Sequence, residues 1–321
     1  MSHAPRLTMN AIPFDDPLRP YIIAEASGNH GQNFNKAMAL IDAAAASGAD
    51  AIKFQTFTAE EICADVPILT GHNQRHDAWI AQLGVTRMPE LFSKGGLPRA
   101  WHLDLKRYAH AQGIAFLSTP FSVEAARFLV EDVGVEALKI ASGDLTFTPL
   151  LEYAAQTNLP IILSTGGSTR EEVVGAMRGP LYQCSGMLVI MHCVSVYPAD
   201  DHFVNLRALH DIRRIGEGFA LGFSDHTLSE DLVPALAMAC GATVLEKHIK
   251  LQEDTTSVDV GHSLDPAAFA RYVEAAKKAC RILGEPYKGP HPLEMHDRLW
   301  ARRSPTDWLR PTDEARGGRW Q

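Results

Sequence analysis

The chain alternates short, continuously apolar runs with segments of helical character, and this alternation limits its folds more than any other feature. Eight runs are typical of buried β-strands, at 21–24, 51–55, 114–118, 137–140, 160–164, 188–192, 219–223 and 242–246. The helical segments between and around them lie at 35–46, 98–110, 123–131, 150–156, 170–177, 206–213, 231–239 and 266–283. Such strands are typical of parallel sheets covered on both faces. Eight of them favour an α/β fold of the closed (β/α)8 (TIM) barrel type over an open doubly wound sheet.

Two segments do not fit the simple repeat. The connection between the second and third strands, 56–113, is too long for a loop even after the helix at 98–110 is subtracted. Loops of this length usually cover a functional site or carry short helices of their own. After residue 284 the chain is punctuated by prolines and is rich in arginine. We therefore expect an N-terminal extension at 1–19, a catalytic barrel with a long insertion after strand 2 at 20–284, and a short irregular C-terminal tail at 285–321.

Composition excludes several classes of protein. The formal net charge is −8 without a basic stripe, which argues against a nucleic-acid partner. No stretch approaches the ~18–20 apolar residues of a membrane span, and the first 20 residues have no apolar core of signal-peptide length. The five cysteines are scattered and include no CxxC pair, which favours reduced thiols and a cytoplasmic location.

Polar side chains collect where the predicted strands end. They include Glu25, Lys53, Gln55, Ser118, Thr119, Lys139, Ser142, Asp144, Ser164, Thr165, Ser195, Tyr197, Ser224 and Glu246. In a parallel barrel these positions converge at the C-terminal rim, where such enzymes carry their active sites.

The two lysines of this set, Lys53 and Lys139, are costly in buried strands unless they meet anions. Two interpretations stay open. With the hydroxyls of Ser118, Thr119, Ser142, Ser164 and Thr165 they form a cradle for phosphate and carboxylate. Alternatively, each pairs with Glu25, Asp144 or Glu246 in a structural network.

His226 and His248 close the seventh and eighth strands, and so we expect both imidazoles at one rim. A single histidine is more often a core residue than a ligand, but two at consecutive strand ends favour a divalent metal site. Substrate and water would complete its coordination sphere. Cys193 follows His192 in a strand, so we expect a buried thiol rather than a nucleophile. The turn Gly166-Gly167 is either a phosphate-binding turn or an ordinary turn with a helix N-cap.

Ordered motifs resemble the sialic acid synthase family, which includes the N-acetylneuraminate, legionaminate and pseudaminate synthases. They are Ala24-Glu25 with Asn29-His30, the runs 48–56, 118–121, 139–143 and 163–166, His192-Cys193, Tyr197-Pro198, 224–227 and 246–248. The resemblance spans roughly 21–284, the catalytic barrel of that family. The family's C-terminal antifreeze-like domain is expected to be lacking from this chain.

The resemblance implies a transferase that condenses phosphoenolpyruvate with a sugar aldehyde, releasing phosphate by C–O cleavage and forming a nonulosonic-type 2-keto-3-deoxy acid. It assigns catalysis to Glu25, Lys53, His226 and His248. It assigns phosphoenolpyruvate binding to Lys53, Thr119, Lys139, Ser142, Ser164 and Ser224, and sugar binding to Gln55, Asn73, Asp144, Tyr197 and Asp259. His226 and His248 would hold a divalent metal, Mn²⁺ with Mg²⁺ or Co²⁺ as alternatives, and a homodimer is implied.

Two other functions stay open. One is a metal-dependent keto-acid aldolase or lyase that uses no phosphate donor. The other is a non-catalytic, sugar-binding homologue, against which the joint presence of Glu25, Lys53, Lys139, His226 and His248 argues, because buried lysines without an anion are destabilising.

Overall fold

The computed structural model describes residues 13–71, 74–216 and 218–317, and within them all eight predicted strands form. They are β1 (Tyr21–Glu25), β2 (Ala51–Thr56), β3 (Ala115–Pro120), β4 (Leu138–Ile140), β5 (Ile161–Ser164), β6 (Leu188–Cys193), β7 (Phe219–Asp225) and β8 (Val244–His248). The strands run parallel in the order β3-β2-β1-β8-β7-β6-β5-β4, so β1 pairs with β8. Strands β3 and β4, at the two ends of this order, lie beside each other. The predicted TIM barrel is confirmed, as a nearly closed barrel.

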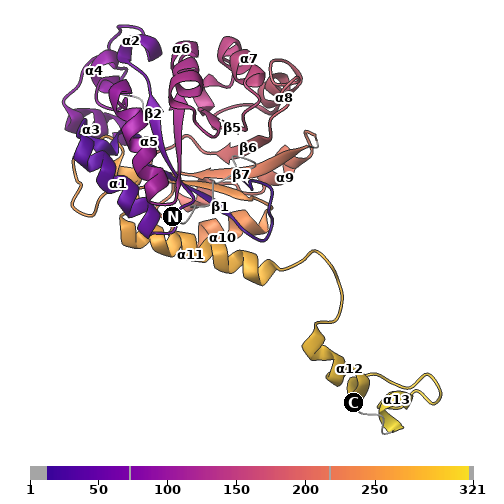
Figure 1. Ribbon diagram of the computed structural model, residues 1–321. Coiled ribbons are helices and arrows are strands. Elements are labelled where there is room, and N and C mark those ends of the chain that lie inside the picture. The colour runs from indigo at the N-terminus through magenta and orange to yellow at the C-terminus, as the bar shows by residue number, and fades with distance from the viewer. Residues whose placement is uncertain (1–12, 72–73, 217, 318–321) are drawn as a thin grey trace, which may run out of the picture. The chain divides into compact units, whose positions relative to one another are not determined.

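The predicted helices also form, and they lie around the outside of the strands (Figure 1). They are α1 (Phe34–Ala46), α5 (His102–Ala111), α6 (Val123–Arg127), α7 (Thr148–Gln156), α8 (Arg170–Arg178), α9 (Ala208–Arg213), α10 (Leu232–Ala239) and α11 (Pro266–Leu283). After α6 the chain continues as a π-helical turn, Phe128–Val133. Short 3₁₀ turns follow three of the strands: η1 (Ser27–His30) after β1, η4 (Ser142–Asp144) after β4 and η6 (Val260–His262) after β8.

The inner face of the barrel changes from apolar to polar along the strands. Its lower layers are filled by a buried cluster of Phe14, Tyr21, Ile23, Ala51, Leu117, Ala137, Ile162, Val189, Met191, Ala220 and Val244. Two positions further along a strand the side chain points inward again. Ile23 is thus followed by Glu25, Ala51 by Lys53 and Val244 by Glu246. The apolar layers form the floor of a polar rim.

Gly222 of β7 shows how tightly these layers pack. A Cβ atom at this position would lie 2.8 Å from Cγ of Met191, which is far inside normal contact distance. Glycine is therefore required here by the approach of a neighbouring side chain and not by an unusual backbone angle.

The insertion after β2 carries three short helices, as expected for a connection of this length. They are α2 (Ala59–Ile62), α3 (Gln74–Leu83) and α4 (Met88–Phe92). The Trp79 indole nitrogen of α3 donates a hydrogen bond to the Val258 carbonyl, at 2.9 Å. His30 Nε2 lies 3.2 Å from the Gly95 carbonyl oxygen at the end of the insertion. These bonds tie the insertion to the loops that follow β8 and β1, at the C-terminal rim.

The chain divides into two compact units, 1–282 and 283–321. The second unit contains α12 (Met295–Ala301) and α13 (Asp313–Arg316). It has polar contacts of its own, since Arg316 pairs with Asp307 at 2.6 Å and Ser304 donates to Asp313 at 2.6 Å. None of the helices in the described ranges combines the length and the apolar character needed to cross a membrane.

Two buried histidines make the stability of the barrel depend on pH. Burial lowers the pKa of His30 and of His102 to about 4, against 6.5 for a free imidazole. Between these two values the unfolded chain binds a proton that the folded chain does not, so the free energy of unfolding falls as the pH falls. We expect a loss of about 2 kcal/mol per histidine between pH 7 and pH 5. Urea unfolding at the two pH values measures it.

A variant isolates the contribution of His102. The Nδ1–H of this ring donates to the Pro98 carbonyl at 3.1 Å, and Nε2 lies 2.7 Å from Thr56 Oγ1. His102→Gln supplies one donor and one acceptor without titrating, so the loss at pH 5 should shrink by about 2 kcal/mol. Thr56→Val removes the bond but keeps the imidazole and should lower stability at both pH values. An unchanged pH dependence in His102→Gln would contradict the assignment.

Candidate active site

The polar rim encloses a cavity of about 370 Å³ at the C-terminal ends of the strands. This volume falls in the range of roughly 300–1,000 Å³ that is typical of small-molecule sites. Twelve residues that the sequence predicted as functional line it together: Glu25, Lys53, Gln55, Thr119, Lys139, Ser142, Ser164, Tyr197, Ser224, His226, His248 and Asp259.

Lys53 lies at the centre of one side of the cavity. Its Nζ atom is 2.5 Å from Glu25 Oε2, donates to Thr119 Oγ1 at 3.0 Å and lies 3.6 Å from Glu246 Oε2. Burial alone would lower the pKa of Lys53, but Glu246 and Glu25 raise it above its usual value. Burial raises the pKa of Glu25 to about 7, with Lys53 acting in the opposite direction. Glu25 can therefore exchange a proton near neutral pH, while Lys53 stays charged.

In the strand order, Glu246 on β8 lies between Lys53 on β2 and Lys139 on β4. The Nζ atom of Lys139 donates to Ser164 Oγ at 2.7 Å and lies 3.7 Å from Glu246 Oε1, which also accepts from Ser224 Oγ at 3.0 Å. Burial lowers the pKa of Lys139. Burial would raise the pKa of Glu246, but Lys139 and Lys53 bring it below its usual value. One carboxylate thus sits between two lysines, in a cavity where an anion can compete for them.

The turn after β5 packs closely against the side of the cavity that carries Ser142. The Gly166 backbone N–H donates to Ser142 Oγ at 2.9 Å. A Cβ atom at Gly166 would lie 3.0 Å from both Ser142 Oγ and Cys193 Sγ, so only glycine leaves this space open. The N-terminus of α8 is closed by a capping box, in which Thr169 Oγ1 accepts from the Glu172 N–H at 3.2 Å and Glu172 accepts from the Thr169 N–H at 2.7 Å. The N-cap is therefore confirmed, and phosphate binding at this turn stays a prediction.

His226 and His248 face each other at the end of β7 and β8, with ring centroids 5.5 Å apart. His226 Nδ1 lies 2.8 Å from the Val194 carbonyl oxygen, which can only accept, so Nδ1 carries a proton. Burial alone would lower the pKa of His226, but Cys193 and the bond to Val194 raise it above its usual value. His248 Nδ1 is buried and has no hydrogen-bond partner in the described ranges. Burial, with the neighbouring His262 and His226, holds the pKa of His248 well below its usual value. His248 is therefore in the neutral form that binds a divalent metal, whereas His226 binds one in competition with a proton at Nε2.

The pair by itself does not complete a metal site. In the part of the chain that the structure describes, no three His, Cys, Asp or Glu side chains are grouped so that they could hold a metal ion. The residues present therefore fit an open site, in which two histidines are joined by ligands that come from outside the protein.

The remaining wall of the cavity is aromatic and comes from loops. His262 lies with its ring centroid 4.4 Å from that of His248 and 4.9 Å from that of Tyr197. Burial lowers the pKa of His262 to about 4. Asp259 Oδ1 is 3.6 Å from His262 Nε2. Trp79 of the insertion also lines this wall.

Some predicted residues lie elsewhere. Asn73 is outside the described residues. Asp144 is not part of the cavity lining; it is half-buried, and burial raises the pKa of its carboxyl to about 6. Ser118 and Thr165, proposed for the anion cradle, are turned away. Ser118 Oγ lies 2.6 Å from Thr56 Oγ1, and Thr165 Oγ1 donates to the Met191 carbonyl at 2.9 Å. Alternation along β3 explains the first case, because Thr119 takes the inward position.

Alternation also bears on Cys193, which we expected to be a buried thiol away from the chemistry but which is the member of the pair His192-Cys193 that points inward. His192 faces away from the cavity, where its Nε2 lies 2.7 Å from the Val204 carbonyl oxygen. Cys193 is buried, as predicted, but it faces the cavity with Sγ 3.7 Å from His226 Nδ1. The apolar positions Val189 and Met191 share its face and carried the signal, since both belong to the inner cluster.

Two further lining residues were not assigned to the site from the sequence. Glu246 was placed at the rim and weighed as a partner for the lysines, but it received no role in the site, although it lies two positions before His248 and so on the same face. His262 had no signal, because it lies in a 3₁₀ turn whose position depends on tertiary contacts.

Comparisons with known proteins identify the family of this chain. Residues 40–288 match the sequence profile of the NeuB family. The chain is 37% identical over 292 residues to N,N'-diacetyllegionaminic acid synthase of Legionella pneumophila, covering 89% of this chain and 79% of that protein. It is 33% identical over 288 residues to pseudaminic acid synthase of Helicobacter pylori, covering 89% and 82%.

A solved structure gives the same result. The N-acetylneuraminic acid (sialic acid) synthetase of Leptospira borgpetersenii, in complex with citrate, superposes with a TM-score of 0.75 at 32% identity and covers 87% of this chain and 90% of its own. Fold, sequence profile and ordered site residues all point the same way, and the chain belongs to the NeuB family.

Proposed function

We propose that this chain is a transferase that condenses phosphoenolpyruvate with a sugar aldehyde to give a nonulosonic-type 2-keto-3-deoxy acid and phosphate. The observation that carries the proposal is the buried group of Lys53, Lys139, Glu25 and Glu246 beside the pair His226 and His248, at the rim of a NeuB-family barrel. The relatives named above are synthases of legionaminic, pseudaminic and N-acetylneuraminic acid.

The charges of the group suit a small, highly charged anion. Each lysine already has hydroxyl partners, Thr119 for Lys53 and Ser164 for Lys139. The phosphate and carboxylate groups of phosphoenolpyruvate would accept hydrogen bonds from the two ammonium groups and from the hydroxyls of Ser142 and Ser224. Ammonium and hydroxyl donors fixed before the substrate arrives stabilise the charge of the departing phosphate without further rearrangement.

The reaction forms one C–C bond and one C–O bond and breaks another C–O bond. C3 of phosphoenolpyruvate bonds to the aldehyde carbon, whose oxygen takes up a proton and becomes a hydroxyl. A water oxygen adds at C2, loses its two protons and becomes the keto oxygen as the bond from C2 to the phosphate oxygen breaks. Glu25 is suited to exchange the protons of these steps, because its pKa of about 7 lies close to the working pH. Gln55 Nε2 donates to Glu25 Oε1 at 3.1 Å and fixes its orientation.

We propose that His226 and His248 hold a divalent metal ion, Mn²⁺ with Mg²⁺ or Co²⁺ as alternatives. Within the described ranges His248 Nδ1 has no hydrogen-bond partner, and the bond from His226 Nδ1 to Val194 leaves Nε2 as the atom of that ring that could meet a metal. When bound, such an ion supplies a Lewis acid for the aldehyde oxygen of the sugar. Gln55, Tyr197 and Asp259 would bind the sugar, and the aromatic wall that includes His262 would limit its size.

We also propose a cytoplasmic location and a homodimer. The five free cysteines, of which Cys193 and Cys280 are buried, suit a reducing compartment. The homodimer rests on the resemblance to the family alone. Cell fractionation and sedimentation of the purified chain check these two points.

His248→Ala should lower the rate of phosphate release by about 10²-fold or more at saturating phosphoenolpyruvate, because the variant loses half of the histidine pair. The assay follows phosphate release with Mn²⁺ and a panel of aldoses that includes N-acylated hexosamines. Mn²⁺ affinity, measured by electron paramagnetic resonance, should fall in the same variant. His110→Ala, on the outer surface of α5, is the matched control and should change neither quantity.

Three outcomes decide between the candidate functions. Phosphate release that requires both phosphoenolpyruvate and an aldose supports the proposal. Cleavage of a 2-keto-3-deoxy acid to pyruvate, with no response to phosphoenolpyruvate, would instead identify an aldolase or lyase. Binding of a sugar without either reaction would identify a non-catalytic homologue.

A further inference from the structure

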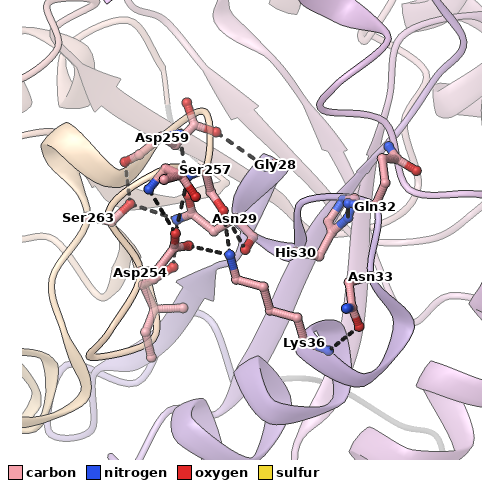
Figure 2. A network of polar contacts seen from close by, with 12 residues as sticks. Gly28, Asn29, His30, Gln32, Asn33, Lys36, Asp254, Ser257, Asp259 and Ser263 are labelled. Atoms are coloured by element: carbon pink, nitrogen blue, oxygen red, sulfur yellow. Dashed lines mark hydrogen bonds and ion pairs between the residues drawn. The ribbon is translucent and has the colours of Figure 1, made fainter. Parts of the chain in front are cut away.

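The loop between β8 and α11, residues 249–265, carries Asp259 and His262 to the acceptor side of the cavity. The side chain that holds this loop comes from the beginning of the barrel sequence. Asn29, in the η1 turn after β1, is fully buried. Figure 2 shows Asn29 at the centre of a polar network, with Ser257, Asp259 and Ser263 of the loop around it.

The Asn29 amide has a partner for each of its polar atoms. Its Nδ2 donates to the Ile249 carbonyl at 2.8 Å and to Ser263 Oγ at 2.8 Å. Its Oδ1 accepts from the Asp259 backbone N–H at 3.3 Å. The Asn29 carbonyl accepts from Ser257 Oγ at 3.1 Å. One residue thus joins the end of β8, immediately after His248, to three points of the loop.

The network also fixes the direction of the bonds. Ser263 Oγ donates to the Asp259 carbonyl at 2.6 Å, so its only hydrogen is already used and it must accept from Asn29. The Ile249 carbonyl can only accept as well. Position 29 therefore requires a side chain with two N–H donors and one acceptor, which an amide supplies and a carboxylate does not.

Bonds from neighbouring residues place the carboxylate of Asp259. The Gly28 N–H donates to Asp259 Oδ2 at 3.2 Å, which leaves Oδ1 on the side of His262. Further out, Lys36 Nζ is 2.7 Å from Asp254 and donates to Ser257 Oγ at 2.6 Å. Lys36 is partly exposed, whereas Asp254 is buried, and these contacts hold the middle of the loop ahead of Asp259.

We propose that Asn29 is the positioning residue of the acceptor subsite, setting Asp259 and His262 against the sugar while leaving the phosphoenolpyruvate cradle unaffected. This inference rests on the proposed function. The cradle is held by its own bonds, Lys53 to Thr119, Lys139 to Ser164 and Ser224 to Glu246, which come from strands β2 to β8. Displacement of the loop therefore weakens acceptor binding selectively.

Asn29→Asp tests this inference, because it keeps the size and the acceptor of the side chain but removes both donors. The KM for the acceptor sugar should rise about 10- to 100-fold, the range expected when buried polar groups lose their partners. The KM for phosphoenolpyruvate should change by less than about threefold. The control is Asn33→Asp, the same substitution four residues away, where Oδ1 caps α1 by accepting from the Lys36 N–H at 3.1 Å and a carboxylate serves equally well.

A second variant covers the case in which Asn29→Asp does not fold. Lys36→Met removes only the contacts that the partly exposed Lys36 makes with Asp254 and Ser257, and it should raise the acceptor KM by about fivefold without changing the KM for phosphoenolpyruvate. An unchanged acceptor KM in this variant would also count against the inference. A folded Asn29→Asp with an unchanged acceptor KM, or an equal rise in both KM values, would overturn the inference. Lack of phosphate release by the unmodified chain in the same assay would reject the proposed function instead.

Discussion

Lys139→Met should lower kcat/KM for phosphoenolpyruvate by about 10³-fold, a loss at the upper end of that seen for a single preorganised donor. Lys139 is buried, and its ammonium group already lies at Ser164 Oγ and near Glu246 before any substrate binds. Methionine fills the same space without the charge. Removal of the ammonium group takes away one of the two cations that would bind the substrate. It also leaves the negative charge of Glu246 less well balanced by positive charge. Steady-state phosphate release at varied phosphoenolpyruvate measures the effect.

The control for this experiment comes from the same rim. Ser118→Ala removes a hydroxyl that the sequence placed in the anion cradle but that faces Thr56 on the outer side of β3. It should change kcat/KM by less than about threefold, since it loses one ordinary hydrogen bond away from the cavity. If Ser118→Ala were as damaging as Lys139→Met, or if Lys139→Met were nearly as active as the unmodified chain, the proposed cradle would be wrong.

Lys247→Met should lower the free energy of unfolding by about 3–5 kcal/mol, because it leaves a buried carboxylate without its partner. Lys247 and Asp225 are both fully buried, on the outward faces of β8 and β7, with Nζ 3.4 Å from Oδ1. Lys247 also donates to the Thr227 carbonyl, and its Nζ atom lies 5.6 Å from the ring centroid of Tyr272. Urea unfolding followed by circular dichroism measures the loss.

Removal of both charges gives the matched comparison. The Asp225 carboxylate accepts from the Thr227 N–H at 2.8 Å, and the amide oxygen introduced by Asp225→Asn can accept the same bond. In the double variant Lys247→Met with Asp225→Asn, no uncompensated charge remains. The double variant should therefore recover at least half of the lost stability, since replacing a buried ion pair by neutral residues is often close to neutral. A double variant less stable than Lys247→Met alone would show that the Asp225 carboxylate stabilises the fold by itself.

The strands and helices of the barrel were predicted well because each depends on residues that lie close together in the sequence. The run at 219–223 and the helix at 231–239 are set by residues that neighbour each other along the chain, and β7 and α10 form within a few residues of these bounds. The same pattern put Glu25, Lys53, Lys139, His226 and His248 at one rim, since every parallel strand ends there. The errors at Ser118 and Cys193 arose within strands, where a shift of one residue reverses the face of a side chain.

Long-range pairing decided the rest. Closure of the sheet by β1 against β8 brings Glu246 between lysines that lie more than a hundred residues before it in the chain. Asn29 reaches Ser263 across 234 residues of sequence. No periodicity encodes such contacts.

The sequence by itself determined the strands, the helices, the rim and most of the residues at it. Only the tertiary structure decided that Cys193 and His262 also face the cavity and that Ser118 and His192 do not. It also decided that Glu246 lies between the two lysines and that Asn29 holds the loop with Asp259. The physical reason is that backbone propensity and alternation depend on nearest neighbours in the chain. The partner of a buried polar group depends on which segments the folded barrel brings within hydrogen-bond distance.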